Sequence, residues 1–251
     1  MIGIIGGNGV VATNTLLQII EDLFTKNGAF RDGHHPEMLI WQATKAPSRS
    51  MYLEGRGESF IDDYVKIGRK LKKNGCTKLC MCCNTAHYAI NDLQKKIGIP
   101  FFNLLEIVAK KANELHLKKV GIMCTDGLKK TELYQKYFEK YAPNTQVIFP
   151  NNKYQALVTK GICNAKNKKR YLSKTNREHP FSLFEKVYRY FEKEGVDGIV
   201  GGCTDISNVY KKESTNKIAY LDSLCLLAEA IYKEERQNNL PPLTPTTTRK
   251  H

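Results

Sequence analysis

The chain alternates short apolar runs with longer amphipathic stretches. The apolar runs are rich in Ile, Val, Leu and Cys, as strands require. We predict strands at residues 2–7, 37–44, 78–83, 100–104, 119–124, 146–150, 197–203 and 218–222. The clearest helical patterns between them cover residues 12–26, 60–75 and 180–195. Near-continuous apolar strands separated by helices are typical of parallel sheets covered on both faces, so the pattern predicts an α/β protein.

The second half of the chain repeats landmarks of the first half. The matching pairs are Ile4 and Gly121, Cys83 and Cys203, and Asn103 and Asp222, at separations of 117, 120 and 119 positions. Three landmarks with nearly one offset indicate two similar units. We therefore expect two pseudo-symmetric domains, each a mainly parallel sheet flanked by helices. Loops at the carboxyl ends of the strands would line a cleft between them, and the active site would lie there.

The expected domain boundaries follow from this repeat. Residues 1–103 together with 223–236 form the half that carries Cys83, and residues 104–222 form the half that carries Cys203. Residues 237–251 are rich in Pro and Thr, which predicts a disordered tail.

The overall composition is that of an ordinary globular protein, with 41% hydrophobic and 25% charged residues. No apolar run approaches the roughly 20 residues of a membrane helix. The first ten residues, MIGIIGGNGV, lack Lys and Arg, so they indicate a first strand rather than a signal peptide. We expect a cytoplasmic protein with no membrane partner.

The formal net charge is +14, but the basic residues are spread along the chain. Stretches such as GRKLKKNG indicate solvated helix faces, and no nucleic-acid-binding motif accompanies the charge. We therefore expect no nucleic-acid partner. A positive field of this kind favours a small acidic substrate.

Two of the eight cysteines stand at equivalent places in the repeat. Cys83 and Cys203 each end an apolar run and precede polar residues that can cap a helix, namely Asn84 or Thr85 and Thr204. A thiol at such a position has a lowered pKa because it lies near the positive end of a helix dipole. The free N–H groups there also bind carboxylates.

Two such thiols facing each other would flank one small acid from opposite sides. One thiolate would remove a proton from carbon, and the other thiol would deliver a proton to the opposite face. This arrangement suits a racemase. The chain contains neither a P-loop nor an obvious pyridoxal phosphate motif, so we expect no cofactor.

Other uses of the cysteines fit the pattern less well. A zinc site would draw on Cys76, Cys80, Cys82 and Cys83, but strand alternation points Cys80 and Cys82 away from Cys83. A hydrolase or ligase with one cysteine nucleophile and His87 as base would leave the second cysteine unexplained. The cysteines assigned to the core or to no role are Cys76, Cys80, Cys82, Cys124, Cys163 and Cys225. We expect no direct catalytic role for His87.

The segments GIIGGNG, PSR, CCNTAHYAI, IPFFNLLE and GGCTDI together resemble the cofactor-independent aspartate/glutamate racemases, over nearly the whole chain up to about Glu235. The resemblance implies two α/β domains, a homodimer and two catalytic cysteines at Cys83 and Cys203. It also implies that Asn84, Thr85 and Thr204 bind the substrate's α-carboxylate and amino groups, that Arg49 clamps the distal carboxylate, and that Lys166 or Lys168 provides the family's lysine.

The sequence departs from the family pattern at two places. Asn8 stands where the first loop usually has Met, which would put an amide in the pocket, and Asp205 stands where the second motif usually has Glu. The resemblance implies interconversion of L- and D-aspartate, or glutamate, or both. Hydantoin racemases, maleate isomerases and arylmalonate decarboxylases share related plans, and a non-catalytic protein that binds a small acid in the same cleft is the alternative from another class.

Overall fold

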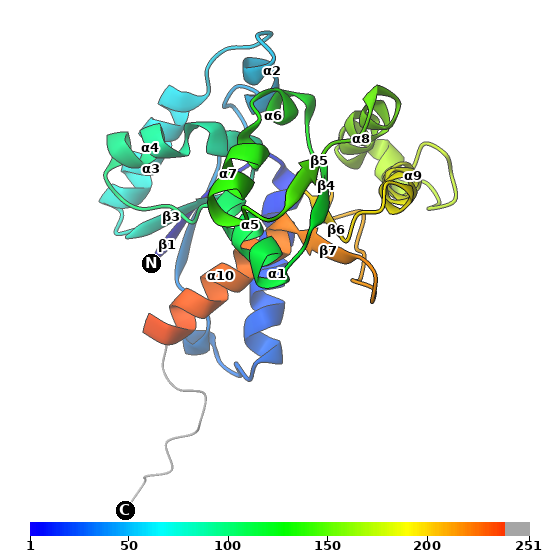
Figure 1. The fold of residues 1–251 in the computed structure, drawn as a ribbon. Helices are drawn as coiled ribbons and strands as arrows, with labels where there is room; N and C mark the ends of the chain where they lie inside the picture. The colour runs from blue at the N-terminus through cyan, green and yellow to red at the C-terminus, as the bar shows by residue number, and fades with distance from the viewer. Residues whose placement is uncertain (239–251) are drawn as a thin grey trace, which may run out of the picture.

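A computed structural model describes residues 1–238 and contains two separate parallel sheets (Figure 1). The first sheet has the order β2-β1-β3, with β1 at Ile2–Gly6, β2 at Met38–Gln42 and β3 at Lys78–Met81. The second has the order β5-β4-β6-β7, with β4 at Lys119–Met123, β5 at Gln146–Ile148, β6 at Gly198–Gly201 and β7 at Ala219–Asp222. The predicted α/β class with parallel sheets is confirmed.

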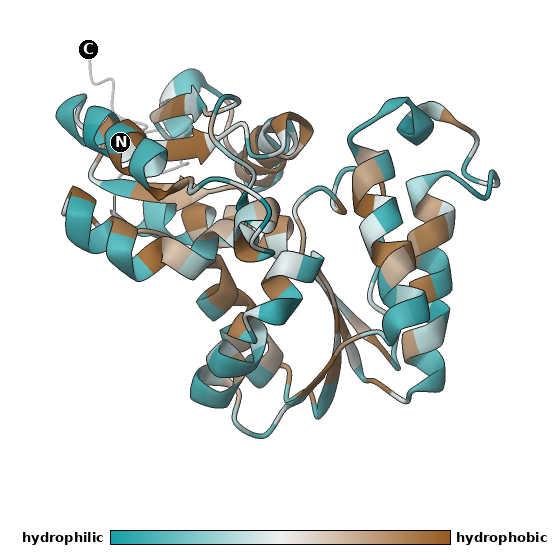
Figure 2. Cartoon of the chain, turned by 90° about the horizontal axis from the view of Figure 1, so that it is seen from above, coloured by the Kyte–Doolittle hydropathy of each residue, from teal (hydrophilic) through white to brown (hydrophobic). Residues whose placement is uncertain are grey.

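Helices cover both faces of each sheet. In the first half these are α1 (Val10–Lys26), η1 (Asp32–His34), α2 (Arg49–Leu53), α3 (Ile61–Lys73), η2 (Thr85–Ala89) and α4 (Ile90–Ile97). The remaining helices are α5 (Leu104–Glu114), α6 (Asp126–Lys130), α7 (Leu133–Tyr141), α8 (Asn152–Ala165), η3 (Lys168–Tyr171), α9 (Pro180–Lys193) and α10 (Ser223–Asn238). Seen from above, α8 and α9 form a hairpin that stands to one side of the molecule (Figure 2).

The two sheets repeat one another in topology. β1 lies between β2 and β3 as β4 lies between β5 and β6, and every pairing is parallel. Asn103 and Asp222 also play equivalent parts, because each caps the helix that follows it. The Asn103 side chain accepts a hydrogen bond from Glu106 N at 3.2 Å, and the Asp222 carboxylate accepts one from Leu224 N at 2.9 Å. The repeat seen in the sequence is therefore a structural repeat.

The predicted strand at 100–104 is wrong in extent. In the first half the fourth strand position is held only by an isolated bridge between Leu79 and Phe101, where the second half has β7. Pro100 lacks the N–H that a longer ladder needs, and Asn103 already caps α5. The chain therefore leaves the sheet almost as soon as it joins it.

The last described helix returns to the first half. Leu224, Leu227 and Ile231 of α10 are buried in one core cluster with Ile4 of β1 and Leu16 of α1. This packing supports the proposed assignment of residues 223–236 to the first domain. The helix continues to Asn238, two residues into the segment predicted to be a tail, and residues 239–251 lie outside the described part of the chain.

Candidate active site

The candidate site lies where the carboxyl ends of the two sheets meet. The Thr204 hydroxyl of the second half donates to the Cys82 carbonyl of the first half at 2.8 Å. The Thr85 and Thr125 hydroxyls meet across the same boundary at 3.1 Å. These bonds hold the loop with Cys83 against the second half and so bring the two predicted catalytic cysteines to one place, as expected for loops at strand carboxyl ends.

Cys83 is only partly buried and lies beside Arg49, the first residue of α2. The guanidinium donates from Nη1 to Pro47 O at 2.9 Å and from Nη2 to Asn8 O at 3.0 Å. Burial lowers the pKa of Arg49, but negative charge on Cys83 and Tyr64 and a hydrogen bond to Cys83 outweigh burial and raise this pKa. A fixed cation therefore stands next to the first thiol.

Asn8, close to Arg49, has a side-chain hydrogen-bond acceptor without a partner. Its amide nitrogen donates to Tyr64 Oη at 2.9 Å and to Ile5 O at 3.3 Å, and its Oδ1 is buried without a partner. Because a backbone carbonyl only accepts, the Ile5 bond fixes which way the amide points. A buried acceptor without a donor costs about 1–3 kcal/mol, so the site is suited to a ligand that brings an N–H or O–H group.

Tyr64 belongs to the same part of the site although sequence reasoning did not select it. It lies on α3, is fully buried and feels the charges of Arg49 and Cys83, with burial as the main cause of its raised pKa. A tyrosine on an amphipathic helix looks like an ordinary core residue, so the residue pattern does not mark Tyr64 as part of a functional site. The fold brings its hydroxyl within hydrogen-bond distance of Asn8 and within electrostatic range of the first cysteine.

Cys203 has an environment of the opposite sign. Its thiol donates to the Asp205 carboxylate at 3.7 Å, and the same buried carboxylate pairs with Lys166 Nζ at 3.0 Å. Burial and then the charge of Asp205 raise the pKa of the Cys203 thiol well above its usual range, while Lys166 opposes the shift. A negative charge on Cys83 raises the Cys203 pKa further. Electrostatics therefore favour the protonated form of Cys203.

Of the two lysines considered, Lys166 is the one that reaches the site. It is the C-cap of α8, and burial lowers its pKa less than the charges of Asp205 and the two cysteines raise it. Lys168 lies in η3 with an exposed side chain. Asp205 differs from the Glu that is usual in the family, yet its carboxylate reaches both Lys166 and Cys203.

Asn84 has both ends of its side-chain amide occupied by protein partners. Its Oδ1 accepts from Tyr134 Oη at 2.8 Å, and its Nδ2 donates to Ser223 Oγ at 3.0 Å.

Both ring nitrogens of His87 are hydrogen-bonded to the backbone. Nε2 accepts from Leu104 N at 3.0 Å, and Nδ1 therefore donates to Cys83 O at 2.8 Å. Burial lowers the pKa of His87 to about 4, so the ring is neutral near pH 7 and supports the chain at Cys83.

Helices were predicted to begin directly after the two cysteines, which is confirmed in part after Cys83 and wrong after Cys203. Asn84 is the N-cap residue of the short 3-10 helix η2, but its side chain makes no cap bond, and α4 begins only at Ile90. After Cys203 the chain forms turns, because the Thr204 hydroxyl donates to Cys82 O instead of capping a helix. The expected lowering of the thiol pKa is also wrong for Cys203, because burial and the charge of Asp205 raise its pKa well above the usual range.

Within residues 1–238, no group of three or more His, Cys, Asp or Glu side chains has an arrangement that could hold a metal ion. Cys80 and Cys82 are buried in the core cluster shared by β1, α1 and α10, whereas Cys83 packs against the cluster on the other face. This split follows the strand alternation predicted from the sequence.

Comparisons with known proteins agree with this architecture. The family model for Asp/Glu/Hydantoin racemase matches residues 3–231. The chain is 25% identical over 233 residues to the broad specificity amino-acid racemase RacX of Bacillus subtilis, which covers 92% of this chain and 96% of RacX. The structure superposes on Picrophilus torridus aspartate racemase with a TM-score of 0.75 and 25% identity over 93% of each chain.

A glutamate racemase from Bacillus anthracis shares the fold, with a TM-score of 0.68 and 18% identity over 98% of this chain and 85% of that chain. Since the family model spans nearly all of the described residues, the chain belongs to the Asp/Glu/Hydantoin racemase family.

Proposed function

We propose that the protein is a pyridoxal-phosphate-independent amino-acid racemase that interconverts L- and D-aspartate, or glutamate, or both. Cys83 and Cys203 are the two bases that exchange a proton at Cα. One thiolate removes the Cα proton, and the other thiol delivers a proton to the opposite face of the planar intermediate. The roles exchange in the reverse direction, so one mechanism serves both enantiomers.

The observation that carries this proposal is the opposite charge beside each cysteine. Arg49 places a fixed positive charge beside Cys83, and burial together with Asp205 favours the thiol form at Cys203. A two-base racemase needs one deprotonated and one protonated group in its resting state, and Cys203 suits the protonated one.

Three groups are left to recognise the substrate. Arg49 keeps a buried Nε without a partner, and Lys166 is half-exposed at the edge of the site; both suit a carboxylate. Asn8 Oδ1 suits the α-ammonium group, which lies one bond from the reacting carbon. Asn84, Thr85 and Thr204 then act mainly through the loop geometry they hold. The Thr204 hydroxyl already donates to Cys82 O, so the donors left for the α-carboxylate are the second N–H of the Asn84 amide and the Thr85 hydroxyl.

The test is a chiral chromatographic assay in D₂O with both enantiomers of aspartate, glutamate, asparagine and alanine. We expect deuterium at Cα and formation of the opposite enantiomer, without any added cofactor. Cys83→Ser and Cys203→Ser should each nearly abolish both signals because a hydroxyl is a far weaker base near neutral pH. The matched control is Cys82→Ser, which should keep most activity.

The outcomes separate the alternatives. Proton exchange and racemisation at a normal rate in Cys203→Ser would exclude the two-base mechanism. Turnover of a hydantoin or of maleate in place of the amino acids would assign the related isomerase reactions. Binding of aspartate with no deuterium incorporation would indicate a non-catalytic small-acid-binding protein.

We also propose that the enzyme works as a homodimer in the cytoplasm. Within residues 1–238, no helix combines the length and the apolar character needed to cross a bilayer. Sedimentation equilibrium of the full chain should give twice the monomer mass, and a monomer at micromolar concentration would refute the dimer. Cell fractionation with a membrane marker and a secreted marker tests the location.

A further inference from the structure

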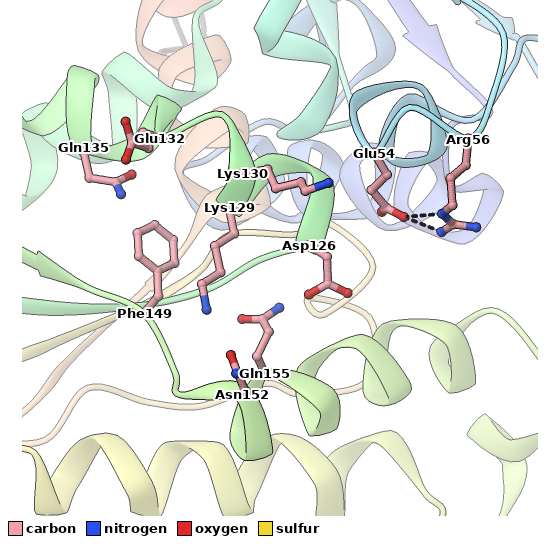
Figure 3. A pocket seen from close by; sticks show the side chains of 10 residues that line it. All are labelled: Glu54, Arg56, Asp126, Lys129, Lys130, Glu132, Gln135, Phe149, Asn152 and Gln155. Carbon is pink, nitrogen blue, oxygen red and sulfur yellow. Dashed lines mark hydrogen bonds and ion pairs between the residues drawn. The ribbon is translucent and has the colours of Figure 1, made fainter.

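A cavity lies between the end of α2 and the helices α6, α7 and α8 of the second half (Figure 3). Its volume is about 610 Å³. None of the residues placed around Cys83 and Cys203 lines it. Its charged lining side chains are Arg56, Lys129, Lys130, Glu54, Asp126 and Glu132, which are three cations and three carboxylates.

Gln155 gives this cavity an acceptor that the protein leaves unused. The side chain is only 6% exposed, and its Nε2 donates to Cys124 O at 3.0 Å, which fixes the orientation of the amide. Its Oε1 is buried and has no hydrogen-bond partner. Figure 3 shows the side chain pointing from α8 into the space between Lys129 and Asp126. Buried hydrogen-bond acceptors normally have a donor, so this oxygen suits a ligand that supplies an N–H or O–H group.

Lys129 supplies the complementary charge. Its amine donates to Pro150 O at 3.0 Å and lies 5.9 Å from the centre of the Phe149 ring, and within residues 1–238 it takes part in no ion pair. Figure 3 shows the amine directed toward the Gln155 amide. A cation and a bare acceptor thus stand side by side in a cavity whose charges balance. Such a lining fits a ligand that carries both charges better than a simple anion or cation.

We propose that this cavity is a second binding site for an amino-acid zwitterion, separate from the two cysteines. The ligand's ammonium group donates to Gln155 Oε1, and its carboxylate accepts from Lys129 Nζ. The inference rests on the proposed function only for the kind of ligand, because an amino-acid racemase works in the presence of its own substrates and products. The geometry of the cavity is independent of the catalytic assignment.

The cavity is joined to the candidate active site through α6. Lys129 lies on α6, and the helix is capped by Thr125, whose hydroxyl also meets Thr85 next to the first catalytic loop. A Cβ on Gly127 of α6 would lie 2.7 Å from Ser50 O, so this helix touches α2 beside Arg49 without room between them. The helix α6 therefore connects the lining of the cavity with the Arg49 side of the candidate active site.

The experiment is equilibrium dialysis of the full chain with radiolabelled L-aspartate and, in a parallel arm, L-lysine. The catalytic site is first blocked by iodoacetamide, which alkylates the reactive cysteines. We expect the alkylated protein to retain one bound amino acid per chain in at least one arm. Gln155→Leu and Lys129→Met should each weaken this remaining binding at least tenfold. Lys193→Met, which removes an exposed charge elsewhere in the second half, is the matched control and should bind normally.

The proposal is overturned if the alkylated wild type binds neither amino acid, or if both cavity variants bind as the wild type does. The same preparations, assayed for racemisation before alkylation, keep the two claims apart. A chain that binds after alkylation but never racemises any amino acid would refute the proposed function and leave the second site standing.

Discussion

The Asp205 carboxylate of the second half lies directly against Gly9 in the first loop of the first half. A Cβ built on Gly9 would come within 2.7 Å of Asp205 Oδ1, closer than real Cβ contacts allow. The carboxylate that pairs with Cys203 and Lys166 therefore packs against a glycine of the opposite half, where a larger residue would not fit. Both halves therefore contribute to the candidate active site, because the backbone of one half limits the position of an ionisable group of the other.

We predict that Gly9→Ala lowers kcat/KM at least tenfold while the protein stays folded. The added methyl group must push Asp205 away, which disturbs its contacts with Cys203 and Lys166. The measurement is kcat/KM for aspartate with circular dichroism as the folding control. Gly33→Ala is the matched variant because nothing lies within 4 Å of a Cβ there, and it should behave as the wild type. Equal activity in both variants would contradict the contact.

The charges around Cys203 predict opposite shifts of the pH profile. Asp205 raises the pKa of the Cys203 thiol and Lys166 lowers it. Removing the carboxylate in Asp205→Asn should therefore move the alkaline limb of kcat/KM to lower pH, because the required thiol deprotonates earlier. Lys166→Met should move the same limb to higher pH. Limbs that coincide in both variants and the wild type would show that Cys203 is not the group titrating there.

Arg49 lies beside Cys83 and also has a donor, Nε, that no protein group uses. Comparing aspartate with alanine as substrates separates these two roles. If Arg49 binds the distal carboxylate, Arg49→Ala should lose at least tenfold in kcat/KM for aspartate, because losing a charged partner in a closed site costs on the order of 2–5 kcal/mol. Turnover of alanine should then change much less. Arg49→Lys should keep the charge but lose most of the selectivity for aspartate. A loss of equal size for aspartate and alanine would assign Arg49 to Cys83 alone.

His87 predicts a measurable pH dependence of stability. Its pKa is about 4 when folded and about 6.5 when unfolded, so the unfolded chain binds the proton first as the pH falls. The stabilising effect of the neutral ring is complete above the unfolded pKa and is lost on acidification toward the folded pKa. Between pH 7.5 and 5.5 this linkage costs the wild type about 1 kcal/mol of unfolding free energy.

In His87→Leu this part of the pH dependence should disappear, since no group is left to titrate. The variant should also be less stable at pH 7.5 by about 2–5 kcal/mol because Cys83 O and Leu104 N lose their buried partner. Urea unfolding at the two pH values measures both effects. His116→Asn is the control, because His116 is exposed with a φ of 53° that asparagine tolerates.

Much of the architecture was predictable because it depends on patterns within short stretches of sequence. Apolar runs that end at Cys83 and Cys203, and the matched landmarks Asn103 and Asp222, are visible in short stretches of sequence. They predicted the sheets and the repeat. The strand at 100–104 was overestimated because the pattern weighs apolar content and not the missing N–H of Pro100.

The finer organisation of the candidate site was beyond the sequence because it depends on contacts between distant segments. Thr204 looks like a helix cap, yet its hydroxyl serves Cys82 O, 122 residues away. Tyr64 looks like core, yet its hydroxyl holds Asn8, 56 residues away. The pairing of Lys166 with Asp205 likewise requires the end of α8 to be placed over the second cysteine loop. Residue spacing contains none of this information.

The return of α10 to the first half has a consequence for synthesis on the ribosome. Leu227 and Ile231 complete the core cluster that Ile4 and Leu16 share on one face of the first sheet, and Leu226 of the same helix belongs to a core cluster of the second half. The amino-terminal half emerges first but cannot complete its core until residues beyond 231 have left the exit tunnel. Both halves of the nascent chain therefore keep part of their apolar surface uncovered until α10 has been made.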